Sequence, residues 1–323
     1  MEKIVNGMRF EGEYVENCWD VRTWTSNGVT ERSARQVVEW TEVPPMRAPL
    51  SWDEYIAQYD YDPAKQARLE QERLDEVEEK RLRSLKSSAR RAKTKCRRFI
   101  ISEGFNEMLT LTYRANQTDR ELCKVHFKEW VRRMKKTLGD FRYCASFEMQ
   151  ERGAMHIHCA TNKLPQHADY KGVKIKAWEL GTRIWRDIIG DYPFVGPLRP
   201  AEAFPVLANG LCFVGGKSKF GAPSRHKPMS LAKMAGYVSK YILKDFESVP
   251  EEKNRYSRSN GEVKAEVHIM RLNGTLADIV ACCFECKDGD VMVDHRISYF
   301  KDSWWLCTER GDGPAAATLH VTH

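Results

Sequence analysis

Two histidines flank a single apolar residue in His156-Ile157-His158. Alternate side chains of a β-strand point to the same face, so both imidazoles would lie on one face while Ile157 enters the core. Two nitrogens placed in this way can bind a metal ion, but the short pattern recurs by chance. A metal site therefore needs a third ligand from a neighbouring strand.

Glu148 supplies that ligand if residues 141–150 and 155–161 form two strands of one hairpin. The three-residue turn Glu151-Arg152-Gly153 would place Glu148 across from His156 on the same face. A change of one residue in the turn length would transfer the role to Glu151 or remove it. We predict a site made by Glu148, His156 and His158, and its imidazole and carboxylate donors suit Mg²⁺ or Mn²⁺.

A second group of reactive side chains follows in Tyr237-Val238-Ser239-Lys240-Tyr241-Ile242-Leu243-Lys244. Tyr237 and Tyr241 would share one face of a helix, and each tyrosine has a lysine three residues later, Lys240 and Lys244. A phenol with a pKa near 10 is a poor nucleophile at neutral pH, and a nearby cation favours the phenolate. We predict catalytic roles for these four side chains, although an ordinary amphipathic helix with Tyr241 in the core would show a similar pattern.

Residues 80–98 hold ten lysines or arginines and no acid, whereas the whole chain has a formal charge of only +7. The rest of the chain is therefore net negative, and the excess positive charge is local. Such a run neutralises phosphates without distinguishing base sequence, although a solvated helix face would look the same. The predicted DNA contacts are Lys80, Arg81, Arg83, Arg90, Arg91, Lys93, Lys95, Arg97 and Arg98.

The pattern of apolar residues predicts an α+β fold. Residues 63–98 have strong helix composition, and residues 108–113 alternate as a strand does. A capping box, Thr118 to Glu121, begins a helix that ends at Gly139. Further elements are predicted at 141–150, 155–161, 177–189, 192–198 and 230–246.

The order β-α-β-β-α-β-α resembles a split β-α-β, ferredoxin- or RRM-like arrangement, an antiparallel sheet with helices on one face and the other face open. We divide the chain into residues 1–98, with strands, turns and a basic helix; residues 99–248, which hold the reactive groups; and a C-terminal extension, 249–323. A polar linker is expected at 250–262.

Three motifs together resemble the HUH endonucleases, and in particular the rolling-circle replication initiators of single-stranded DNA phages. They occur in the order of that family: Leu109-Thr110-Leu111-Thr112-Tyr113, then Glu148 through His158, then Tyr237-Val238-Ser239-Lys240-Tyr241. The resemblance covers about Phe99 to Phe246, under half of the chain.

The resemblance implies that His156 and His158 bind a divalent metal and that Tyr237 or Tyr241 attacks a DNA phosphate. The products would be a 5′-phosphotyrosine and a free 3′-hydroxyl. The implied partners are single-stranded or supercoiled origin DNA and a host helicase and polymerase. No Walker-type phosphate loop is present, because Gly215-Gly216-Lys217-Ser218 lacks the spaced first glycine.

Three alternatives remain at this point. A plasmid relaxase or transposase of the same superfamily would share the chemistry. A non-catalytic single-strand binding module would use an open sheet and a basic arm without cleavage. A metallohydrolase using a bound hydroxide would release its product with no protein-linked intermediate.

Composition favours a soluble cytoplasmic protein, since no stretch of about 18 apolar residues occurs and the first residues lack the pattern of a signal peptide. The ten cysteines are interpreted as reduced thiols. One group, Cys282, Cys283, Cys286 and Cys307, has some features of a zinc site, but the irregular spacing favours buried strand cysteines.

Overall fold

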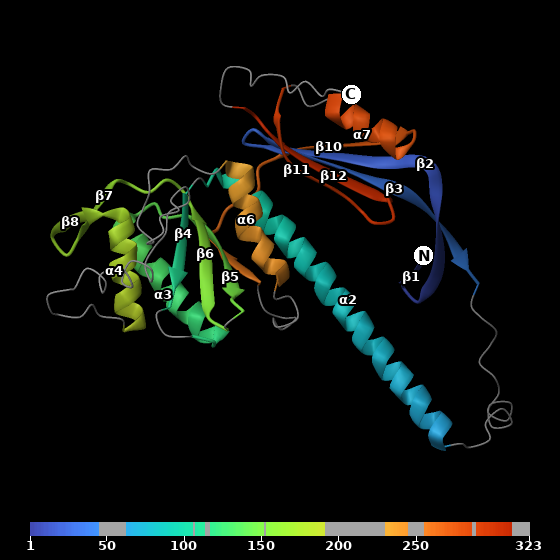
Figure 1. Cartoon of the computed structure of the whole chain (residues 1–323), viewed down its shortest axis with the longest axis horizontal. Coiled ribbons are helices and arrows are strands. Elements are labelled where there is room, and N and C mark those ends of the chain that lie inside the picture. The colour runs from blue at the N-terminus through green and yellow to red at the C-terminus, as the bar shows by residue number, and fades with distance from the viewer. Residues whose placement is uncertain are drawn as a thin grey trace. The chain divides into compact units, whose positions relative to one another are not determined.

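The computed structural model describes residues 1–44, 63–105, 107–113, 117–151, 153–190, 230–244, 255–285 and 289–311. The chain divides into two compact units (Figure 1): unit 1 comprises Met1–Arg83 and Ala265–His323, and unit 2 comprises Ser84–Lys264. Antiparallel sheets and helices make both units, which confirms the α+β class. The division differs from the three sequence segments because the N-terminal and C-terminal strands share one sheet.

Unit 1 contains a six-stranded antiparallel sheet in the order β1-β2-β3-β12-β11, with β10 paired to β2. Its N-terminal part uses the two-residue turns Asn6-Gly7 and Asn27-Gly28, in which both residues have positive φ, as type I′ turns require. The strands are β1 (Glu2–Val5), β2 (Met8–Ser26), β3 (Val29–Val43), β10 (Glu266–Asn273), β11 (Val291–Ile297) and β12 (Ser303–Glu309).

Helix α7 (Leu276–Glu285) supplies the rest of the unit 1 core. Its Ile279 and Cys283 pack with apolar side chains of β2, β3 and β12, a cluster that includes Trp19, Trp304 and Leu306. Of the four cysteines considered above, Cys282 and Cys283 therefore lie on a helix and not on a strand, Cys307 is buried on β12, and Cys286 lies outside the described residues.

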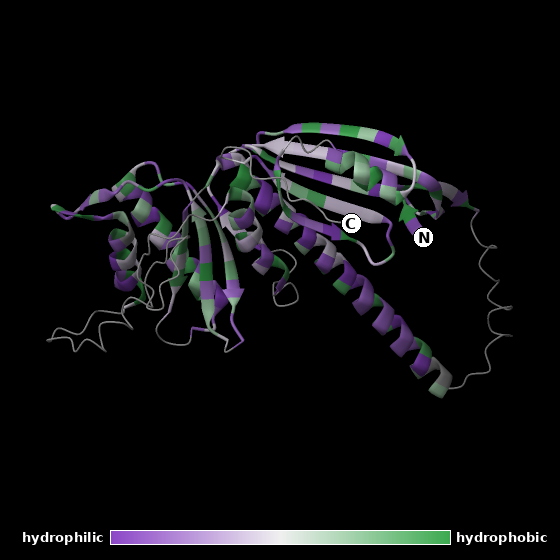
Figure 2. Ribbon diagram, turned by 45° about the horizontal axis from the view of Figure 1, so that its top comes forward, coloured by the Kyte–Doolittle hydropathy of each residue, from purple (hydrophilic) through white to green (hydrophobic). Residues whose placement is uncertain are grey.

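Helix α2 (Pro63–Glu103) confirms the helix predicted over residues 63–98 and continues five residues further. Every described side chain from Ala67 to Arg81 is exposed, and Figure 2 shows hydrophilic residues along this part of the helix. A helix that is polar all round is stabilised mainly by ion pairs between successive turns. Such pairs join Glu76 to Lys80, Glu78 to Arg81 and Glu79 to Arg83.

Unit 2 has a four-stranded antiparallel sheet in the order β4-β6-β5-β9. Helices α3 (Arg120–Leu138) and α4 (Ala177–Ile189) pack against one face, whereas α6 (Leu231–Lys244) contacts β5 and β6. The strands are β4 (Glu107–Thr112), β5 (Tyr143–Met149), β6 (Met155–Thr161) and β9 (Tyr256–Arg258).

The sequence predicted helices on one face of this sheet, but the structure has them on both faces. All residues of β5 from Tyr143 to Glu148 are buried. A strand that is buried on both faces needs cover on both. Helix α6 provides that cover over part of the face that was expected to be open.

Other local differences concern caps and short strands. Asp119, not Thr118, caps α3, because its carboxylate accepts hydrogen bonds from the backbone of Glu121 and Leu122. An unpredicted hairpin, β7 (His167–Tyr170) and β8 (Val173–Lys176), precedes α4. The predicted extended segment 192–198 and the glycine-rich loop 215–221 lie outside the described residues.

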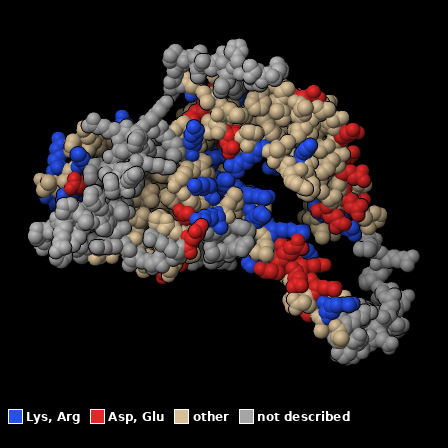
Figure 3. All heavy atoms as spheres, in the orientation of Figure 1, with Lys and Arg blue, Asp and Glu red and all other residues tan. Residues whose placement is uncertain are grey.

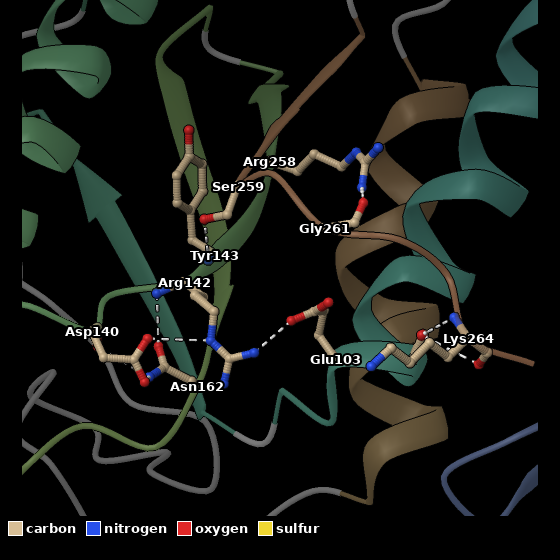
Figure 4. Close-up of polar contacts among 10 residues, drawn as sticks. Glu103, Asp140, Arg142, Tyr143, Asn162, Arg258, Ser259, Gly261 and Lys264 are labelled. Atoms are coloured by element: carbon tan, nitrogen blue, oxygen red, sulfur yellow. Dashed lines mark hydrogen bonds and ion pairs between the residues drawn. The ribbon is translucent and has the colours of Figure 1, made fainter.

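Part of the expected linker at 250–262 forms β9, which extends the sheet beside β5. Figure 4 shows how this return of the chain is held: Ser259 Oγ accepts a hydrogen bond from the backbone nitrogen of Tyr143, and Arg258 donates to the carbonyl oxygen of Gly261. Nearby, Arg142 forms an ion pair with Glu103 at 2.6 Å, which ties the end of α2 to β5.

Candidate active site

The β5–β6 hairpin sets the register of the three predicted metal ligands. Glu148 lies directly opposite His156, and Ser146 lies opposite His158. The turn is closed by a hydrogen bond from the Gln150 nitrogen to the Ala154 oxygen, and Gly153 has a φ of +83°. The predicted pairing of Glu148 with His156 is therefore present.

Glu148, His156 and His158 are a group that can hold a metal ion: one donor atom from each lies within 4.8 Å of the others. No other group of three or more His, Cys, Asp or Glu side chains of this kind occurs among the described residues. Glu151, the alternative ligand, is exposed in the turn and outside this group. Two imidazole nitrogens and one carboxylate leave coordination positions open, which fits a divalent ion that also takes a phosphate oxygen.

Neighbouring polar side chains orient the histidines. Thr110 Oγ1 on β4 lies 3.4 Å from His158 Nδ1, and Gln150 Nε2 lies 3.2 Å from His156 Nδ1. Such outer contacts fix the orientation of a metal-binding imidazole. Our sequence interpretation did not assign roles to these two residues. Strand alternation carried the signal for Thr110, because β4 pairs this residue with His158.

The Glu148 carboxylate is held between two cationic or hydrogen-bonding partners. His158 Nε2 lies 2.9 Å from one oxygen, and Lys244 Nζ donates to the other at 2.8 Å. Burial raises the pKa of Glu148, but the hydrogen bonds from His158 and Lys244 outweigh burial and lower that pKa to about 2. Glu148 is thus ionised and ready to bind a cation, and Lys244, expected beside a tyrosine, contacts this carboxylate.

Helix α6 is fixed against the sheet by a buried polar contact. Ser146 Oγ on β5 donates a 2.7 Å hydrogen bond to the carbonyl oxygen of Val238. Small buried residues, Ala232 and Ala235, lie on the same helix. This seat brings the middle of α6 over the two histidines.

The two tyrosines lie directly beside His158. The Tyr241 ring stacks on the His158 imidazole with centroids 4.3 Å apart and an interplanar angle of 12°, and the Tyr237 ring meets His158 edge-on at 5.5 Å. Lys240 Nζ lies 4.2 Å from the centroid of Tyr237 and 4.7 Å from that of Tyr241. The predicted metal ligands, both tyrosines and Lys240 therefore form one site.

The tyrosines differ in environment. Tyr241 is buried, and its pKa is raised well above the ordinary value by burial, by a hydrogen bond with Tyr237 and by the charge of Glu148. Tyr237 is only half-buried. A phenol that loses its proton easily and can be reached by a substrate is the better nucleophile, so the geometry favours Tyr237.

The basic run lies on α2. Lys80, Arg81 and Arg83 pair with glutamates of the preceding turns. Arg90, Arg91 and Lys95 are exposed, whereas Lys93, Arg97 and Arg98 are half-buried.

Comparison with protein families places this site in a known context. Residues 106–246 match the family of the replication-associated protein known as ORF2 or gene 2 protein. The match encloses the three candidate metal ligands and both tyrosines, and it supports a replication initiator family. The chain matches no curated protein and no solved structure. None of the described helices is long and apolar enough to cross a membrane.

Proposed function

We propose that the protein initiates rolling-circle replication by nicking and rejoining single-stranded origin DNA through a tyrosine-linked intermediate. The observation that carries the proposal is the contact of Tyr237 and Tyr241 with His158, a member of the candidate metal group. The match to the replication-associated family over residues 106–246 supports the same role.

The reaction is a transesterification. The phenol oxygen of one tyrosine forms a bond to phosphorus, the bond from phosphorus to the 3′-oxygen breaks, and the phenol proton is lost while the 3′-oxygen gains one. The number of phosphodiester bonds is unchanged, so rejoining by the reverse step needs no added energy source. A divalent ion, Mg²⁺ or Mn²⁺, would be held by Glu148, His156 and His158 and would neutralise charge on the scissile phosphate.

The residues of the chain supply orientation and charge. Lys240, above both rings, favours the phenolate form of whichever tyrosine attacks. Lys244 and His158 keep Glu148 ionised. Tyr237, which is half-buried, attacks first, and the buried Tyr241 attacks in the second round, when the regenerated origin must be cut while the first strand end remains attached.

The test uses a single-stranded DNA library of random sequence, labelled at its 3′ ends, with Mg²⁺ or Mn²⁺. The wild-type protein should retain the 3′ label covalently, and mass spectrometry should find the adduct on Tyr237 or Tyr241. Tyr237→Phe should lower adduct yield more than Tyr241→Phe, and the double variant should give none.

Two results would contradict the proposal. Cleavage without any attached DNA would indicate a metallohydrolase that uses bound hydroxide. Binding with neither cleavage nor adduct at any metal concentration would indicate a single-strand binding module.

A further inference from the structure

The β7–β8 hairpin of unit 2, residues 167–176, carries three lysines that the proposed chemistry does not use. Lys174 and Lys176 are exposed on β8, and Lys171 is exposed in the turn. We call this hairpin the lysine arm. Figure 3 shows basic side chains gathered at the left edge of the molecule, where Figure 1 places β7 and β8.

The turn of the lysine arm differs from the other two-residue turns of this chain. Asn6-Gly7 and Asn27-Gly28 follow the preference of type I′ turns for Asn-Gly, whereas the arm has Lys171-Gly172 at φ values of +54° and +78°. A lysine at positive φ is strained by its Cβ in a way that asparagine tolerates better. The chain thus has a positive charge at a position where local stability favours asparagine.

The arm is seated firmly on unit 2. Ala168 and Ile175, opposite each other in the ladder, are buried in the main core of the unit with residues of α3 and α4. The other residues of the ladder alternate to the outer face, and this face includes Lys174 and Lys176. The outer face is therefore presented on a fixed base.

The positive charge of the arm is not neutralised within the protein. Asp169, the one acid of the hairpin, accepts a hydrogen bond from the backbone nitrogen of Gly172 at 3.1 Å. Lys171, Lys174 and Lys176 form no ion pair with another described residue, although Lys171 Nζ lies 5.3 Å from the centroid of the Tyr170 ring. Three cations on one ribbon are suited to an extended polyanion.

We propose that the lysine arm binds the phosphate backbone of duplex DNA, with the two-stranded ribbon entering or lying along the major groove. This groove is wide enough for a two-stranded β-ribbon, and alternate outward positions are about 6.6 Å apart, so successive lysines reach different phosphates. The described outer face offers no exposed aromatic ring on which a single-stranded base would stack. The inference rests on the proposed function, because a nicking protein must hold the duplex that flanks its cleavage site.

The test compares two triple variants of equal charge change in the full chain. Lys171→Asn, Lys174→Gln and Lys176→Gln removes the charges of the arm while restoring an Asn-Gly turn, so folding is retained. Lys128→Gln, Lys135→Gln and Lys136→Gln removes three exposed cations from α3 as the matched control. Binding to a duplex of arbitrary sequence and to a single strand is measured across a salt series.

The arm variant should bind duplex more weakly than wild type and flatten the slope of log K against log salt by about 2.7, from about 0.9 for each of three lost contacts. The control should change the slope far less. An unchanged slope, or an equal change in the control, would overturn the proposal, and a loss confined to the single strand would overturn the assignment to duplex.

Adduct formation on the single-stranded library separates this inference from the proposed function. The arm variant should form the tyrosine adduct at the wild-type rate. If the wild-type protein forms no adduct, the proposed function fails while the duplex measurement still decides the role of the arm.

Discussion

The sheets of the two units bury different kinds of side chain. In unit 1 the cluster beneath α7 is apolar, with Trp19, Trp304 and Leu306 among its members. In unit 2 the face beneath α6 buries Glu148 and His158. Burying charged or polar groups costs free energy unless they are bonded, and a purely structural sheet would place apolar residues there. The comparison teaches that unit 1 is built for stability and that unit 2 gives up stability for a site.

The strongest test of this comparison removes a buried polar residue of unit 2. His158→Ala should lower the rate of adduct formation by roughly 10³-fold, equal to about 4 kcal/mol of transition-state stabilisation, while the fold survives. Rates are measured over a metal titration, with circular dichroism as the check on folding. The control, His167→Ala, alters an exposed histidine of the same unit. Full activity in His158→Ala would mean that the polar face is not a metal site.

The corresponding change in unit 1 removes an apolar anchor. Trp304→Ala should lower the free energy of unfolding by about 3–5 kcal/mol, because it leaves a cavity beneath α7. Urea unfolding followed by fluorescence measures the loss. The neighbouring Trp305, which is only half-buried, provides the matched control, and Trp305→Ala should cost less. Equal losses at the two positions would show that the apolar cluster is not what holds unit 1 together.

A pH series distinguishes the units through Glu148. Its pKa of about 2 in the folded protein lies below the ordinary value of 4.5, so the ionised carboxylate stabilises unit 2 above pH 4.5. This contribution should disappear as the pH falls from 4.5 to 2. In metal-free buffer, Glu148→Gln should therefore show a flatter dependence of the urea midpoint on pH in that range. The exposed Glu151→Gln should follow wild type, and identical curves for all three proteins would contradict the electrostatic role of Glu148.

The smallest expected effect concerns α2, whose cations lie on both sides of the boundary at residue 83. Neutralising Lys86, Arg90 and Arg91, which lie in unit 2, should flatten the salt slope of DNA binding by about 0.7–0.9 per lost contact. Neutralising Lys80, Arg81 and Arg83 should have less effect, because glutamates of the same helix already pair with them. Equal slopes for the two triple variants would mean that α2 does not distinguish the units.

The sequence predicted unit 2 far better than unit 1, for physical reasons. Period-two alternation and a short turn placed Glu148 opposite His156, because the contacts involved are local. The strands of unit 1 pair residues more than two hundred positions apart, such as Trp304 with Ala34, and no local pattern encodes that pairing. The lysine arm was missed because β7 and β8 have only four residues each.

Within the site, the sequence placed side chains on faces but did not give their partners. The i, i+4 spacing put both tyrosines on one face of α6. It did not show that Tyr241 stacks on His158 or that Lys244 reaches Glu148. These contacts depend on how α6 crosses β5, which the Ser146 hydrogen bond fixes.

The discontinuous sheet of unit 1 has a consequence for synthesis on the ribosome. Strands β2 and β3 emerge early, but their partners β10 and β12 begin only at Glu266 and Ser303. At ordinary elongation rates of about 5–20 residues per second, the early hairpin waits roughly 10–45 s for them. During that interval both of its edges are unpaired apart from β1, and unit 2 emerges complete in between. The nascent chain therefore carries a finished catalytic unit while its first hairpin still offers edges to other chains, so unit 1 is where a chaperone is needed.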